Sequence, residues 1–98
     1  MFVEALPEAM DAAAAGLGGI GASVAAGNAA GAAPTMGVIP PAPEPASVLL
    51  AMAFAAHGGV FQVTQALGTV VHELFVTTLG VSSGSYAASE GFNALAMT

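Results

Sequence analysis

Hydrophobic and small residues recur near the start of the chain at alternating steps of three and four, which places them on one face of a helix. Pro7 suits the first turn of such a helix, and Glu8 and Asp11 lie near its positive end. The repeated positions are Met10, Ala13, Leu17, Ile20, Val24, Gly27 and Gly31. This pattern predicts a helix over residues 7–33, about 40 Å long.

A proline-rich stretch interrupts the pattern at residues 34–44. Its prolines remove backbone donors and disfavour helical geometry in the residues that precede them. The stretch is therefore predicted to form a loop, and Pro45 is expected to be the first residue of a second helix, over residues 45–79.

Two hydrophobic rows run along the second helix, about 100° apart around its axis. The leucine row consists of Leu49, Ala53, Ala56, Val60, Val63, Leu67, Val70, Leu74 and Thr78. The phenylalanine row consists of Leu50, Phe54, Phe61, Gly68, Phe75 and Leu79. One row is expected to pack against the first helix. The other then has nothing in this chain to cover it, and an exposed aromatic row usually marks an interface.

The pattern as a whole predicts an all-α fold, an antiparallel two-helix hairpin over residues 1–79 that completes a four-helix bundle with a partner chain. The partner-binding candidates are Leu50, Phe54, Phe61, Phe75 and Leu79. A wide core face is the alternative interpretation, although a hairpin offers little second-layer material for it. Glycines at 80, 84 and 91 predict that residues 80–98 form a frayed segment that orders on binding.

Composition and charge favour a partner chain and exclude several function classes. The 98 residues include six acids, no Lys or Arg and no Cys, with a net charge of −6. Without basic side chains, binding to nucleic acid or electrostatic attachment to anionic lipid is not expected. Because a core of this size is marginal and no disulfide can reinforce it, a partner chain is the leading source of stability.

Residues 48–71 are long and apolar enough to raise the alternative of a transmembrane helix, with mean hydropathy of the chain at +0.83. His57, Gln62, Gln65 and other polar residues interrupt this stretch, and no basic flank would orient it. The length and hydropathy of this stretch keep open an alternative function, that of a membrane- or cell-surface-associated component acting in envelope permeability. The acidic N-terminus also lacks the positive region of a cleavable secretory signal, so export would need another signal.

Candidate chemistry is sparse. "GLGGIG" at residues 16–21 has the glycine spacing of a dinucleotide-binding turn, but helical sequence precedes it and no strand pair is predicted. "HEL" at residues 72–74 begins like a zinc-protease motif, yet Val76 stands where the second His is required. We therefore expect no cofactor, no metal and no enzymatic activity.

Several stretches together resemble the PE family of mycobacteria, which is named for a Pro-Glu pair that Pro7 and Glu8 match. "GIGASVAAGNAAGAAPT" is similar to the family's first helix, "GVIPPAPEPAS" to its loop, and "FAAHGGVFQ" and "VVHELFVTTL" to its second helix. "SSGSYAASEGFNA" resembles the family's C-terminal region, where Tyr86 and Glu90 fit the Y-x-x-x-[D/E] secretion motif. Spacing alone would indicate only an incidental surface pair one helical turn apart.

The resemblance implies that this chain is the non-catalytic subunit of a 1:1 heterodimer with a PPE protein. It also implies that the two helices of this chain join helices of the PPE protein in a bundle. It implies export by a type VII (ESX) secretion system, with Tyr86 and Glu90 read by the secretion machinery. A cytosolic chaperone is expected to act on this chain only indirectly, through the PPE partner. The exported protein would be extracellular or lie at the surface of the cell envelope.

The uncovered hydrophobic row generates a first prediction. Expressed alone, the chain should aggregate or fold poorly, whereas co-expression with its partner should yield a soluble 1:1 complex. Size-exclusion chromatography with light scattering would measure this difference. A stable monomer with a sharp melting transition would contradict it.

Overall fold

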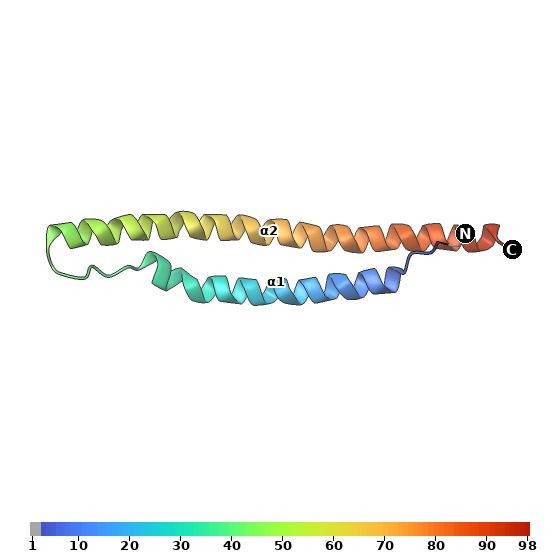
Figure 1. Ribbon diagram of the computed structural model, residues 1–98, viewed down its shortest axis with the longest axis horizontal. Coiled ribbons are helices and arrows are strands. Elements are labelled where there is room, and N and C mark those ends of the chain that lie inside the picture. Colours follow the sequence, from blue (N-terminus) through green and yellow to red (C-terminus); the bar gives the residue numbers. More distant parts are fainter. Residues whose placement is uncertain (1–2) are drawn as a thin grey trace. The chain divides into compact units, whose positions relative to one another are not determined.

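The computed structural model describes residues 3–98, which contain two α helices and no strand. Helix α1 covers Pro7–Met36 and helix α2 covers Pro45–Ala96 (Figure 1). The all-helical prediction is thus confirmed, and the two long helices are consistent with a helical hairpin. The chain divides into a loop unit, Ala22–Val70, and a terminal unit, which joins the residues up to Gly21 with Val71–Thr98. Within each unit, a segment of α1 lies beside a segment of α2.

Both helices begin at the prolines that the sequence pattern indicated. The Leu6 carbonyl accepts the N–H groups of Ala9 and Met10, at 3.0 and 3.2 Å, where α1 begins at Pro7. Proline is favoured at this position because its missing N–H would have no partner there and its φ is already helical.

The start of α2 is capped by Glu44, whose carboxylate accepts the Ser47 hydroxyl and, at 2.9 Å, the Ser47 N–H. These hydrogen bonds, the one from the Ser47 side chain first, lower the pKa of Glu44 below its ordinary value of 4.5. A lowered pKa means that the folded chain favours the ionised carboxylate. The contribution of this cap is therefore present above the ordinary pKa and is lost as the pH falls through the lowered one.

Helix α1 extends beyond its predicted end at residue 33, with Pro34 inside the helix. Proline removes only one helical hydrogen bond this close to the end. The Gly37 N–H still reaches the Ala33 carbonyl, at 2.8 Å, and the Thr35 hydroxyl donates to the Gly31 carbonyl, at 2.7 Å. The loop predicted at residues 34–44 consequently occupies residues 37–44.

Helix α2 continues to Ala96 instead of ending near Leu79, so the frayed segment predicted for residues 80–98 is wrong. None of the described glycines adopts a positive φ, and each of those at 80, 84 and 91 is accommodated within the helix. Helical glycine costs up to about 1 kcal/mol relative to alanine, so it needs compensating contacts. Such contacts come from the N-terminal residues, which hydrogen-bond to this part of α2.

In the loop unit, the face of α2 that meets α1 is made of small and polar residues. Ala51 and Gly58 are buried, and Gln62 is half-buried with its amide donating to the Thr35 hydroxyl oxygen at 2.7 Å. A side chain on Gly58 would run into the Thr35 carbonyl. The backbones therefore approach too closely for Leu or Phe to fit between them.

The internal face of the terminal unit combines polar residues with larger apolar ones. Ser83 is buried, with only 2% of its surface exposed, and donates to the Pro7 carbonyl at 2.9 Å. The His72 Nε2 lies 2.7 Å from the Leu17 carbonyl oxygen. Because a carbonyl can only accept, this nitrogen carries the proton. Val76 and Leu79 are half-buried along the same line of α2.

The prediction that one of the two rows of α2 packs against α1 is therefore wrong, since nearly all members of both rows are exposed. Leu79 is the exception in the phenylalanine row, being half-buried. The repeat predicted for α1 is divided in a similar way. Met10, Leu17 and Gly31 are half-buried, and Ala13, Ile20, Val24 and Gly27 are exposed.

The close approach at Gly58 can be tested by substitution. Gly58→Ala should lower the free energy of unfolding, since overpacking costs about 1–3 kcal/mol and outweighs the gain in helix propensity, up to about 1 kcal/mol. Gly59→Ala is the matched control, because a Cβ there meets no atom within 4 Å. Urea unfolding of the co-purified complex measures both. Equal midpoints for the two variants would contradict the proposed clash.

Candidate functional site

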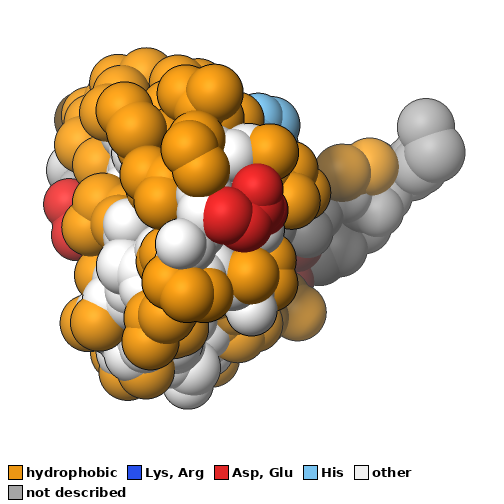
Figure 2. All heavy atoms as spheres, turned by 90° about the vertical axis from the view of Figure 1, so that its left-hand side faces the viewer, with side chains coloured by type: hydrophobic (Ala, Val, Ile, Leu, Met, Phe, Trp, Pro, Cys, Tyr) orange, Lys and Arg blue, Asp and Glu red, His pale blue; other side chains and the backbone are white. Residues whose placement is uncertain are grey.

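The main candidate site is the exposed apolar surface of α2. In the loop unit, Leu50, Phe54 and Phe61 have 50%, 58% and 47% of their surface exposed. In the terminal unit, Phe75 is 56% exposed. Figure 2, which views the molecule from the end with the loop, shows hydrophobic side chains over most of the visible surface. Such a surface is suited to association with another apolar surface, not to contact with water.

Two of the phenylalanines border a hollow in the loop unit of about 390 Å³. Phe54, Phe61 and Val38 supply its large apolar side chains. Its remaining lining residues are Pro34, Thr35, His57 and Gly58. This mostly apolar lining could receive a bulky hydrophobic side chain, and His57 is the titratable group there.

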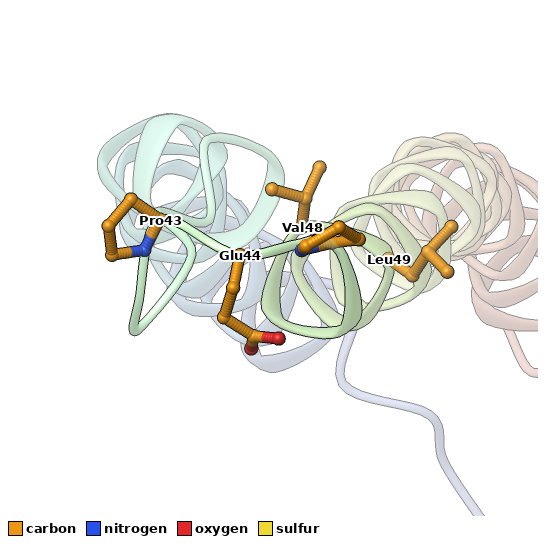
Figure 3. Close-up of a pocket in the computed structure, with 5 residues that line it drawn as sticks. Pro43, Glu44, Val48 and Leu49 are labelled. Carbon is orange, nitrogen blue, oxygen red and sulfur yellow. The ribbon is translucent and has the colours of Figure 1, made fainter.

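A second hollow, of about 470 Å³, lies where the loop leads into α2. It is lined by Pro43, Glu44, Pro45, Val48 and Leu49. Figure 3 shows that the labelled side chains point in different directions and do not converge on one point. The Glu44 carboxylate is engaged in capping α2, so this hollow offers no cluster of groups for catalysis or ligand binding.

A third hollow, of about 320 Å³, lies between α1 and α2 in the loop unit and is more polar. Asn28, Gln62, Gln65 and Thr69 are among its lining residues. Among the described residues, the buried Gln65 Oε1 has no hydrogen-bond partner. A water molecule bonded to this oxygen would satisfy it.

The predicted secretion motif lies on the part of α2 that was expected to fray. Tyr86 is half-exposed, with 50% of its surface accessible, and Glu90 lies one helical turn further on. Glu90 is half-buried, and its Oε1 accepts the backbone N–H of Ala5, at 3.0 Å. Tyr86 follows Phe75 by three helical turns, so the two aromatic side chains share a face of α2.

The family-motif residues lie in the same unit as Tyr86 and Glu90. Glu8 is exposed in the first turn of α1, and the Pro7 carbonyl accepts the hydroxyl of Ser83. The structure therefore brings Pro7 of the Pro-Glu pair next to the helix that carries the Tyr-Glu pair. Sequence reasoning missed the roles of Ser83 and Ala5. The one available signal was the spacing of Ser83 and Glu90, seven residues apart on one helical face.

The two histidines belong to different units of the chain. His57 lies in the loop unit, and His72 is bonded to the Leu17 carbonyl in the terminal unit. Across residues 3–98, no group of three or more potential metal ligands is found. The glycines of "GLGGIG" lie inside α1, where a side chain on Gly21 would come within 2.9 Å of the His72 ring. Of these glycines, Gly21 is thus the one that leaves room for a side chain of α2.

These features define a class of protein: an all-helical chain whose two helices meet through small and polar residues and present apolar side chains outward. The chain belongs to the PE family, whose model matches residues 3–93.

Relatives from Mycobacterium tuberculosis (strain ATCC 25618 / H37Rv) agree with this assignment. PE family protein PE13 is 50% identical over 95 residues, covering 97% of this chain and 96% of PE13. PE family protein PE8 is 45% identical over 97% of this chain, but the match covers only 34% of PE8. PE-PGRS family protein PE_PGRS8 is 43% identical over 99% of this chain and 55% of its own length. The chain thus matches nearly all of one relative and a part of the two longer ones.

The exposed phenylalanines lead to a third prediction. Phe61→Asp should abolish co-purification with the partner, because a carboxylate would be buried without a compensating partner. Thr77→Asp is the matched control. It adds the same charge at an exposed position of α2, one turn from the exposed Glu73, and should leave pairing intact. Affinity co-purification of each variant measures the effect, and unchanged recovery with Phe61→Asp would contradict the placement of Phe61.

Proposed function

We propose that this chain is a non-catalytic subunit that pairs 1:1 with a PPE protein and is exported by type VII secretion. The observation that carries the proposal is the exposure of Phe54, Phe61 and Phe75 on a chain whose described residues bury almost no hydrophobic side chain. Membership in the PE family supports it, because the resemblance of this chain to that family implies a PPE partner.

The arrangement of the helices supports pairing through α2. Its inner face in the loop unit is occupied by small and polar residues against α1, and all members of the leucine and phenylalanine rows except the half-buried Leu79 are left for another chain. Helices of a PPE protein packed on these rows would complete a four-helix bundle. Leu50, Phe54, Phe61 and Phe75 would then become buried, with Leu79 at the edge of the contact.

The export signal in this proposal is formed by Tyr86 and Glu90. Tyr86 is half-exposed on a regular helix, so its ring and hydroxyl are available to the secretion machinery. The chaperone would bind the PPE subunit of the complex. The destination would be the extracellular space or the surface of the cell envelope.

The second candidate function, an envelope-associated component, is favoured by one observation. Helices α1 and α2 are both long and apolar enough to cross a membrane by length and composition. Core helices and signal sequences satisfy the same criterion, so this is weak support. Helix α2 is also about 78 Å long, far more than the roughly 30 Å of a bilayer core. Carbonate extraction separates the two functions, because it releases a peripheral subunit and leaves a spanning helix in the membrane.

The proposed export signal gives a fourth prediction. Tyr86→Ala should reduce secretion at least tenfold while the complex with the partner still forms, since Tyr86 would be recognised by the machinery and not by the partner. Phe92→Ala removes another exposed aromatic side chain from the same end of α2 and should be exported normally. Immunoblots of culture filtrate and cell pellet measure export. Normal secretion of Tyr86→Ala would remove this residue from the signal.

A further inference from the structure

The N-terminal segment, Val3–Leu6, is held against the last part of α2 by hydrogen bonds. The Ala5 N–H donates to Glu90 Oε1, at 3.0 Å, across 85 positions of sequence. Two residues further along, the Pro7 carbonyl accepts the hydroxyl of the buried Ser83, at 2.9 Å. These contacts tie the segment to α2 on both sides of Leu6.

The spacing of the two contacts shows how the segment runs. Two extended residues cover about 7 Å, and the seven helical residues between Ser83 and Glu90 cover about 10 Å. The segment therefore continues along α2 in the direction opposite to the helix. Val3 and Glu4 then line a hollow of about 440 Å³ together with Glu90, Asn93 and Met97.

Glu90 is suited to this contact for a chemical reason. The Ala5 N–H precedes α1 and has no helical carbonyl to bond to, and a carboxylate is a strong acceptor for such a group. The sequence contains no Lys or Arg, so no ammonium or guanidinium side chain of this chain can compete for Glu90. The acid is thus joined to the backbone of the N-terminal segment, one helical turn from Tyr86.

We propose that the secretion signal is composite: Glu90 is a positioning residue that fixes Val3–Leu6 beside Tyr86, and this segment is part of the surface that the secretion machinery recognises. This inference rests on the proposed function. It differs from direct recognition of the Glu90 charge, because the task of the carboxylate is to accept a hydrogen bond.

The two mechanisms predict different results for the neutral variant. Glu90→Ala should lower export at least tenfold. Glu90→Gln keeps both the length and an acceptor oxygen, so it should restore export to at least half of the wild-type level. Glu73→Gln, at an exposed position of the same helix, is the charge control and should leave export unchanged.

The donor can be tested separately. Ala5→Pro removes the N–H that Glu90 accepts, so it should lower export as strongly as Glu90→Ala. Ala5→Val introduces a side chain close to proline in size but keeps the N–H, so this variant should be exported like the wild type. Each variant is expressed with the partner in a mycobacterial host that exports the wild-type chain, and co-purification confirms that the complex forms.

A structural readout independent of export completes the test. In the purified complex, hydrogen exchange of the Ala5 amide should be at least tenfold faster in Glu90→Ala than in the wild type, and Glu90→Gln should restore the protection.

The outcomes separate this inference from the proposed function. If Tyr86→Ala blocks export and Glu90→Gln exports no better than Glu90→Ala, the machinery reads the charge and the composite signal is wrong. If Ala5→Pro is exported normally, the N-terminal segment has no role. If Tyr86→Ala itself is exported normally, the proposed signal fails. The positioning role of Glu90 is tested separately, and it is overturned if the Ala5 amide exchanges at the same rate in Glu90→Ala as in the wild type.

Discussion

The close approach of α1 and α2 is the constraint on which the rest of the structure depends. In the loop unit, Gly58 leaves room for the Thr35 carbonyl, and the nearby Gln62 amide bonds to the Thr35 hydroxyl. Where the helices approach this closely, Leu and Phe do not fit between them, so the large side chains of the loop unit point elsewhere. The exposed apolar surface of α2 is therefore a direct result of what lies between the helices.

Within each unit, hydrogen bonds also determine how the segment of α1 aligns with the segment of α2. The contacts of Gln62 with Thr35, of His72 with Leu17 and of Ser83 with Pro7 each join one position of α2 to one position of α1. Small apolar side chains alone would tolerate sliding, because alanine and glycine offer similar surfaces at many positions. A slip of one residue would break these bonds and leave their polar groups unpaired, which is costly where they are buried.

Much of the fold followed from the sequence, because prolines and hydrophobic spacing act locally. Pro7 and Pro45 marked the starts of both helices, and the absence of alternating patterns correctly indicated an all-α chain. The end of α2 could not be read locally. Gly80, Gly84 and Gly91 suggested fraying, but this part of α2 is a regular helix. Its residues Ser83 and Glu90 bond to Pro7 and Ala5, which lie at the other end of the sequence.

The choice of inner face was not predictable from hydrophobicity either. Periodicity identified two apolar rows, and the usual expectation that one of them forms the core failed. In the loop unit, the face that α1 covers holds Ala51, Gly58 and Gln62, so its sequence signal is a helical spacing of small and polar residues. The spacing of Phe54 and Phe61 places them on one face of α2. Spacing alone does not say whether that face turns toward α1 or away from it.

The small and polar inner face has a thermodynamic consequence. The contacts between α1 and α2 remove little hydrophobic surface from water. The free energy of this burial therefore offsets only a small part of the entropy cost of ordering the backbone. If another chain supplies the missing burial, folding and association become one equilibrium. The melting temperature would then rise with total protein concentration, as it does for obligate dimers, instead of being a fixed property of the polypeptide.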